Sequence, residues 1–124
     1  MKQFNLQKGS RGEEEAARYL GQKGYQILER NHRTKFGELD IIASDKETLV
    51  FVEVKTKIGE DFGSPEEMIN SKKLRQVKRT AQMYLLANEA LRQKHKQQRI
   101  DAVAIVLREN GSPERVSHYE NIGA

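Results

Sequence analysis

Two apolar runs separated by a short polar turn, within residues 37–57, constrain the fold of this chain more than any other feature. The runs read Leu-Asp-Ile-Ile-Ala and Leu-Val-Phe-Val-Glu-Val, and positions 44–48 between them read Ser-Asp-Lys-Glu-Thr. Strands are rich in β-branched and aromatic residues, and a polar insert of this kind is typical of a hairpin loop. We therefore predict two antiparallel strands with a turn closed by Ser44 and Leu49.

The pairing that this turn sets divides the side chains of the hairpin between two faces. Residues alternate between the faces of a strand, so one register assigns every side chain. One face is predicted to be wholly apolar, with Ala43 opposite Val50, Ile41 opposite Val52 and Leu39 opposite Val54. The other face is predicted to hold Ile42 opposite Phe51, Asp40 opposite Glu53 and Glu38 opposite Lys55.

Opposed carboxylates at positions 40 and 53 suit a hard divalent cation. Directly paired side chains have Cβ atoms about 4.5 to 5.5 Å apart, so Asp40 and Glu53 can reach one ion between them. Mg²⁺ and Mn²⁺ prefer oxygen ligands and keep several waters. Lys55, on the same face, is placed to orient a water or to offset charge on a phosphate under attack. The alternative is a solvated row of ion pairs, which Glu-x-Lys forms on many exposed strands.

Length and charge indicate one soluble domain with an anionic partner. A chain of 124 residues is long enough for a single core. Lysine and arginine outnumber aspartate and glutamate by 22 to 18, and the net charge of +4 favours an anionic partner without requiring one. Without cysteine, a signal peptide or a long apolar run, we expect a cytoplasmic protein with no membrane contact. Residues 1–9 are expected to be a poorly ordered lead-in to a domain of residues 10–124.

A first helix is predicted to begin at Ser10 and to end near Gly24. Ser10 and Glu13 have the spacing of a capping box, and an apolar stripe follows them. Glu13 then has two interpretations. It is a cap that stabilises the helix by up to about 1 kcal/mol, or it is an acidic group that joins Asp40 and Glu53. The residues alone favour the cap.

Basic side chains gather before the acidic strand and at the start of a second helix. Arg33 and Lys35 lie in a polar connection just ahead of residue 37, and cationic side chains suit phosphate oxygens. A helix is predicted from Ser71 to about Gln93. Its first turns carry Lys72, Lys73, Arg75, Lys78 and Arg79. Positive charge near a helix N-terminus costs stability, so this clustering favours an anionic ligand. The alternative for both groups is a merely solvated surface.

The remaining segments complete an α/β fold. Residues 25–28 are predicted to start a strand, residues 100–107 to form a buried central strand, and residues 116–122 to form a weak edge strand. The expected order is α-β-β-β-α-β, with a mixed central sheet flanked by helices. No two of the three histidines have metal-ligand spacing, which argues against zinc.

Several separated motifs, taken in order, resemble one family of nucleases. They are Gly12-Glu13, Gly24-Tyr25, Arg30-Asn31, Gly37-Glu38-Leu39-Asp40, Phe51-Val52-Glu53-Val54-Lys55 and Phe62-Gly63. Together they resemble the bacterial YraN-like family of the PD-(D/E)xK, restriction-endonuclease-like superfamily, which is related in plan to the archaeal Holliday junction resolvases. The likeness extends to about Leu107. One departure is Leu39, which stands where the superfamily motif has proline.

The resemblance implies a site and a substrate. It implies that Asp40 and Glu53 bind Mg²⁺ or Mn²⁺, that Lys55 positions the attacking water, and that Glu13 adds an acidic group from the first helix. The implied activity is hydrolysis of phosphodiester bonds in DNA, including structured or branched DNA. Cutting a junction takes two incisions, which favours a homodimer. One alternative is a nucleic-acid-binding module with this fold and no turnover, and another is a small interaction protein whose charged hairpin forms only ion pairs.

Overall fold

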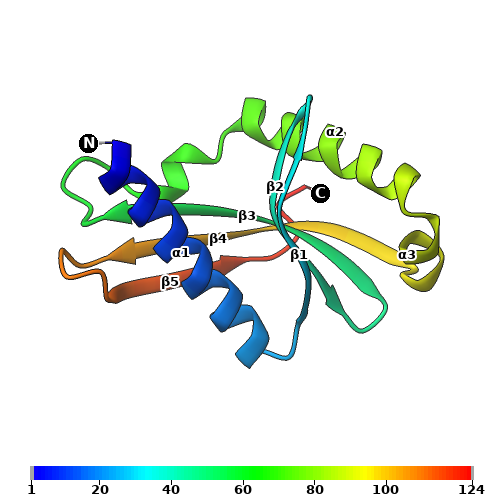
Figure 1. The fold of residues 1–124 in the computed structure, drawn as a ribbon, viewed down its shortest axis with the longest axis horizontal. Coiled ribbons are helices and arrows are strands. Elements are labelled where there is room, and N and C mark those ends of the chain that lie inside the picture. The colour runs from blue at the N-terminus through cyan, green and yellow to red at the C-terminus, as the bar shows by residue number, and fades with distance from the viewer. Residues whose placement is uncertain (1, 124) are drawn as a thin grey trace.

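A computed structural model describes residues 2–123, with their side chains from residue 10 onward (Figure 1). Its elements in chain order are α1 (Lys2–Gln22), β1 (Gln26–Thr34), β2 (Gly37–Asp45), β3 (Thr48–Ile58), the 3₁₀ helix η1 (Pro65–Met68), α2 (Ser71–Ala87), α3 (Glu89–Lys94), β4 (Gln97–Leu107) and β5 (Pro113–Tyr119). The strands form one sheet in the order β1-β2-β3-β4-β5.

The sheet is mixed. β3 and β4 are parallel, and every other neighbouring pair is antiparallel. A parallel pair needs a crossover connection, and here η1, α2 and α3 supply it. The predicted α/β class with a mixed central sheet is therefore confirmed.

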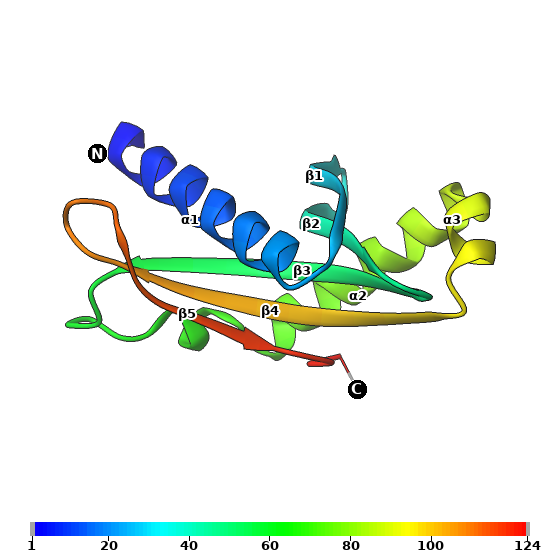
Figure 2. The same cartoon turned by 90° about the horizontal axis from the view of Figure 1, so that it is seen from below.

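The helices cover opposite faces of the sheet. α1 crosses β3, β4 and β5 diagonally (Figures 1 and 2), and its Ala16 and Leu20 pack in one apolar cluster with Val52. α2 contributes Val77 to a second cluster, in which Phe51 faces the other way. Adjacent residues of a strand point to opposite faces, so β3 serves both clusters. Each large side chain buried in them stabilises the fold by about 1.5 to 3 kcal/mol.

The predicted hairpin register is confirmed where β2 and β3 pair. Ser44 pairs with Leu49, and the pairing continues as predicted to Ile41 and Val52. The described β2–β3 pairing ends there. β2 goes on pairing with β1 alone as far as Gly37.

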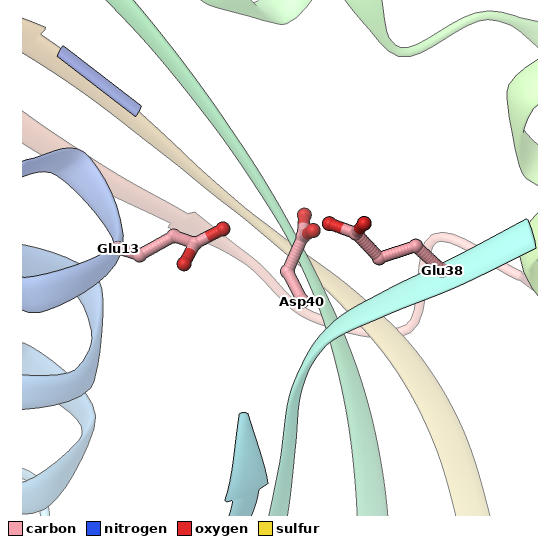
Figure 3. Close-up of side chains that lie close together, drawn as sticks. All are labelled: Glu13, Glu38 and Asp40. Carbon is pink, nitrogen blue, oxygen red and sulfur yellow. The ribbon is translucent and has the colours of Figure 1, made fainter. Parts of the chain in front are cut away.

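The described pairing lacks three of the predicted pairs: Leu39 with Val54, Asp40 with Glu53, and Glu38 with Lys55. They are absent because β2 turns away from β3 between Asp40 and Glu38 (Figure 3). The backbone N–H of Val54 donates instead to the side chain of Asp40. Leu39 packs in the cluster under α2, so its predicted place on the same face as Ile41 is wrong. A bend in the strand breaks the strict alternation on which that prediction depended.

Several element boundaries also differ from the predicted ones. α1 already runs from Lys2, so Ser10 lies inside the helix and the predicted start at Ser10 is wrong. The sequence also predicts that residues 1–9 form a poorly ordered lead-in. The side chains of these residues lie outside the described part of the chain. The second helix is interrupted at Asn88, which has ψ of 67° and whose side-chain amide donates to the carbonyl of Tyr84. The predicted helix is therefore divided into α2 and α3.

The strands are longer than predicted or displaced. β1 extends to Thr34 because its pairing with β2 continues as far as Gly37, so Arg33 lies in a strand and not in a loop. β4 begins at Gln97, and β5 ends at Tyr119 instead of residue 122. Within residues 2–123, no helix combines the length and the hydropathy needed to cross a bilayer.

Candidate functional site

One polar cavity of about 530 Å³ contains all the acidic residues singled out from the sequence. It lies among α1, the β1–β2 hairpin, β3 and α2. Its lining residues are Glu13, Arg33, Thr34, Gly37, Glu38, Asp40, Glu53, Val54, Lys55, Lys73 and Gln76. Four predicted residues, Glu13, Asp40, Glu53 and Lys55, thus meet in one place although they come from three different elements.

Glu13 reaches the cavity because α1 lies very close to β3. A Cβ atom on the preceding residue, Gly12, would overlap the side chain of Thr56 in β3. Glycine permits an approach that any other residue would block. The close packing of α1 therefore depends on Gly12 and sets the position of Glu13.

The opposite wall is formed where the turn of the β1–β2 hairpin contacts α2. Gln76 Nε2 donates to the carbonyl of Phe36 at 3.3 Å, and the far end of the hairpin lies beside α2 in Figure 1. Gly37 has φ of +150°, and a Cβ atom there would lie 2.8 Å from Gln76 Nε2. Asn70 caps α2 by accepting from the backbone N–H of Lys73 at 2.9 Å, which fixes the first turn of the helix.

Three carboxylates converge inside the cavity (Figure 3). One oxygen each from Glu13, Glu38 and Asp40 lies within 4.8 Å of the others, and the carboxylate of Asp40 stands between the other two. Glu38 was not predicted as a site residue. The signal that could have found it is its place two residues before Asp40, which assigns both to one strand face. Glu38 is also paired with Arg33, whose Nε lies 3.2 Å from Glu38 Oε2.

Burial strongly affects the protonation of this group. Asp40 is 8% exposed, and its Oδ2 accepts from Val54 N at 2.8 Å. Burial, with the nearby charge of Glu53, raises the pKa of Asp40 from 3.8 to about 8. Burial also raises the pKa of Glu13, although Arg30, with its NH2 atom 4.0 Å from Glu13 Oε2, acts in the opposite direction. The cavity therefore disfavours this much negative charge without a counter-ion.

Glu53 has the most exceptional environment. It is 2% exposed, and its Oε1 is the only buried side-chain oxygen among the described residues that has no hydrogen bond. Lys55 Nζ and Lys73 Nζ lie 3.2 and 3.4 Å from this oxygen, so both pair with it by charge but in directions that make no hydrogen bond. A buried oxygen left without a hydrogen bond normally costs about 1–3 kcal/mol.

The donor set fits a hard divalent cation. The available donors are carboxylate oxygens from Glu13, Glu38, Asp40 and Glu53, the ligand type that Mg²⁺ and Mn²⁺ prefer. A cation would coordinate Glu53 Oε1, which has no hydrogen bond, and would favour the ionised form of Asp40. The residues present therefore fit such an ion.

The basic residues predicted to bind nucleic acid lie in several places. Arg33 and Lys73 line the cavity itself. Lys35 and Arg79 lie over the ring of Phe36, at 5.4 and 4.5 Å from its centroid. Lys78 instead lines a different cavity of about 340 Å³. Two further predicted residues are exposed on α2: Lys72 and Arg75.

The fold and the site together define an α/β protein whose mixed sheet carries a partly buried group of carboxylates and lysines. Comparison with known families then gives its membership. The chain belongs to the uncharacterised protein family UPF0102, whose family model matches residues 12–105. This range includes every residue of the cavity described above.

Relatives from several bacteria match most of the chain. A UPF0102 protein of Persephonella marina is 50% identical over 103 residues, which cover 83% of this chain and 86% of the relative. UPF0102 proteins of Pelotomaculum thermopropionicum and Alkaliphilus oremlandii are 41% and 42% identical, covering 91% and 95% of this chain and 92% and 98% of the relatives.

Proposed function

We propose that this protein is a metal-dependent endonuclease that hydrolyses phosphodiester bonds in DNA, with a centre of the PD-(D/E)xK type. The observation that carries the proposal is the meeting of Glu13, Asp40, Glu53 and Lys55 in one cavity, with Glu53 Oε1 buried and lacking a hydrogen bond. Three carboxylates and a lysine from three different elements thus form one set suited to metal-dependent hydrolysis. Membership of UPF0102 is compatible with this function but does not test it.

Asp40 and Glu53 would hold Mg²⁺ or Mn²⁺, and Glu13 and Glu38 offer further carboxylate oxygens on either side of Asp40. When bound, the ion supplies Lewis-acid activation of the phosphate and of the attacking water. The hydrogen bond from Val54 N to Asp40 fixes the orientation of that carboxylate before any ion arrives. Such pre-positioning reduces the reorganisation needed during the reaction.

Lys55 would act directly on the reacting groups. It follows Glu53 by two residues on β3, and its side chain is 21% exposed at the cavity. Its ammonium can donate a hydrogen bond to the attacking water, which fixes the direction of attack. The same positive charge offsets the negative charge that builds on the phosphate oxygens.

The charge distribution supports nucleic acid as the substrate class. The chain has a net charge of +4, and Arg33 and Lys73 line the cavity while Lys35 and Arg79 lie at the adjacent hairpin turn. Few aromatic residues accompany them, which favours contacts to the phosphate backbone over base stacking. We extend the proposal to structured and branched DNA because backbone contacts recognise shape.

A cleavage assay tests this function. Duplex, flap and four-way-junction DNA, with matched RNA, are incubated with the protein and Mg²⁺ or Mn²⁺, alongside Asp40→Asn. We expect cutting of at least one DNA substrate by the parent and at least a 10²-fold loss in the variant. Equal cutting by both proteins would indicate a contaminating nuclease and overturn the proposal.

A second candidate function follows from the two lysines at Glu53. Because Lys55 and Lys73 already neutralise this carboxylate, the fold can bind nucleic acid without a metal or turnover. That function predicts DNA binding that weakens steeply with salt, no heat of Mn²⁺ binding in isothermal titration, and no cutting of any substrate.

A further inference from the structure

Lys73 lies inside the acidic cavity and not only along the surface of α2. Its Nζ is 3.4 Å from Glu53 Oε1, the same oxygen that Lys55 approaches to 3.2 Å. Its side chain is 26% exposed, compared with 21% for Lys55. We propose that Lys73 is a second catalytic lysine, which binds an oxygen of the scissile phosphate once a divalent cation occupies Glu53. This inference rests on the proposed nuclease function.

The position of Lys73 is fixed by the start of α2. Asn70 accepts from the backbone N–H of Lys73, so the residue lies in a capped first turn. Val77, one turn later, is buried against the sheet, and Gln76 lines the same cavity. Residues four apart share a helix face, so Lys73 projects toward Glu53 from the wall opposite α1.

Two ammonium groups at one carboxylate oxygen are more than its single charge needs. A cation bound by Asp40 and Glu53 would replace the two ammonium groups as the partner of Glu53 and would repel both. Lys55 is on the same strand as Glu53 and remains beside it. Lys73 reaches in from a different element with a long, flexible side chain, so it can turn toward an incoming phosphate.

The contact between Lys73 and Glu53 has the character of one that can be displaced. Glu53 Oε1 has no hydrogen bond, so neither ammonium is directed at it. Breaking this contact therefore costs charge attraction only. An anionic phosphate brought beside the cation would give Lys73 a new negatively charged partner in place of Glu53.

A purely structural role for Lys73 predicts a different outcome. If Lys73 only neutralises Glu53, its removal destabilises the fold, and the cutting rate falls in proportion to the folded fraction. If Lys73 acts as proposed, its removal eliminates a positive charge that lies near the bound cation and repels it. Metal binding then tightens while catalysis weakens, a combination that a structural role does not produce.

The test compares Lys73→Met and Lys73→Arg with the parent and with Lys94→Met, an exposed lysine of α3 remote from the cavity. Isothermal titration with Mn²⁺ measures affinity without DNA. Cleavage of the substrate that the parent cuts, at saturating Mn²⁺, gives kcat and KM, and thermal melting reports folding.

We expect Lys73→Met to bind Mn²⁺ about threefold to tenfold more tightly, as loss of a nearby like charge allows, and to lose about 10²-fold in kcat. Lys73→Arg should retain most of kcat, and Lys94→Met should match the parent throughout. Unchanged Mn²⁺ affinity, or unchanged kcat, in a folded Lys73→Met would overturn the role of Lys73 while leaving the nuclease function intact. A parent protein that cuts nothing would overturn both.

Discussion

The carboxylate of Asp40 accepts a hydrogen bond from the backbone N–H of Val54 at 2.8 Å, just beyond the last described pair of the β2–β3 ladder. A side chain thus takes a backbone donor that would otherwise serve the ladder. The bond connects the bend of β2 to the orientation of Asp40. The bond sets which way this carboxylate points, and Figure 3 shows it between the carboxylates of Glu13 and Glu38.

The raised pKa of Asp40 predicts a fall in stability as pH rises. Between about pH 4 and the folded-state pKa of about 8, the folded protein holds a proton that the unfolded chain has released. The free energy of unfolding therefore decreases across this window when no metal is bound. Asp40→Asn removes this decrease and keeps an oxygen that can accept from Val54 N. In EDTA at pH 8 we expect the variant to melt several degrees above the parent, as measured by circular dichroism.

The matched control for this measurement is Asp61→Asn, because Asp61 is exposed in the loop after β3. It should follow the parent at every pH. If the difference in melting temperature between Asp40→Asn and the parent is the same at pH 5 and at pH 8, the raised pKa of Asp40 is contradicted.

Glu38 is expected to contribute to metal binding although the sequence analysis did not select it. Its carboxylate lies within 4.8 Å of those of Glu13 and Asp40. Glu38→Gln removes one negative charge and should weaken Mn²⁺ binding about tenfold, as measured by isothermal titration. Glu114→Gln, at an exposed position of β5, is the control. Equal affinities in the two variants would exclude Glu38 from the ligand set.

Gly12 and Gly21 offer a matched pair of substitutions in α1. A methyl group at Gly12 would overlap Thr56, whereas a methyl group at Gly21 meets nothing within 4 Å. Gly12→Ala should therefore destabilise the protein by about 1–3 kcal/mol through overpacking. Gly21→Ala should stabilise it by up to about 1 kcal/mol through helix propensity. Urea unfolding measures both changes.

Gly12→Ala also tests whether the site depends on how closely α1 packs. Moving the helix away from β3 displaces Glu13, so Mn²⁺ affinity should fall in this variant and remain unchanged in Gly21→Ala. Stabilisation by both substitutions would show that the Gly12–Thr56 contact is not required.

A separate buried network near the end of α1 predicts loss of stability in acid. Asp101 is fully buried and accepts from Arg99 Nε at 2.9 Å and from Asn121 N at 2.9 Å, and His118 Nε2 lies 2.7 Å from it. Burial alone would raise the pKa of Asp101, but these hydrogen bonds outweigh it and hold the pKa below 3.8. Its stabilising effect is therefore complete above about pH 4 and is lost as pH falls through the lower folded-state value.

Asp101→Asn should cost about 1.5–3 kcal/mol at pH 7, because partly buried Arg99 loses its bond to a buried carboxylate and keeps only its ion pair with Glu120 at 2.9 Å. The cost should shrink as the pH is lowered below about 4, because the parent then begins to lose the stabilising effect of the ionised carboxylate. Urea titrations at pH 7 and pH 3 measure this difference. A cost that is equal at both pH values would show that the carboxylate charge does not stabilise the fold.

Much of the hairpin could be predicted because alternation and turn chemistry are local signals. The register was correct through Ile41 and Val52, and the two faces were correct over the same stretch. The bend at Asp40 could not be predicted from alternation. It depends on a hydrogen bond to Val54 and on the contact of the hairpin turn with α2, and both arise only in the assembled fold.

The site residues likewise divide into those that local signals predict and those whose place depends on the assembled fold. Asp40, Glu53 and Lys55 were found from strand pairing, and Glu13 needed the resemblance, since Ser10 and Glu13 also satisfy the capping pattern. That pattern is misleading here because Ser10 lies inside α1. Lys73 and Lys78 could not be separated by composition. Their different surroundings follow from the rotation of α2 about its axis, which is set by packing of Val77 and its neighbours against the sheet.

The parallel pairing of β3 with β4 sets the order in which this molecule can be assembled during translation. Glu53 pairs with Ala102 on β4, a strand that leaves the ribosome only after α2 and α3. A nascent chain that ends in α3 already carries every carboxylate of the cavity but lacks the strand that holds Glu53 in place. The acidic centre is therefore completed late, and a prematurely terminated product is expected to lack the proposed nuclease activity.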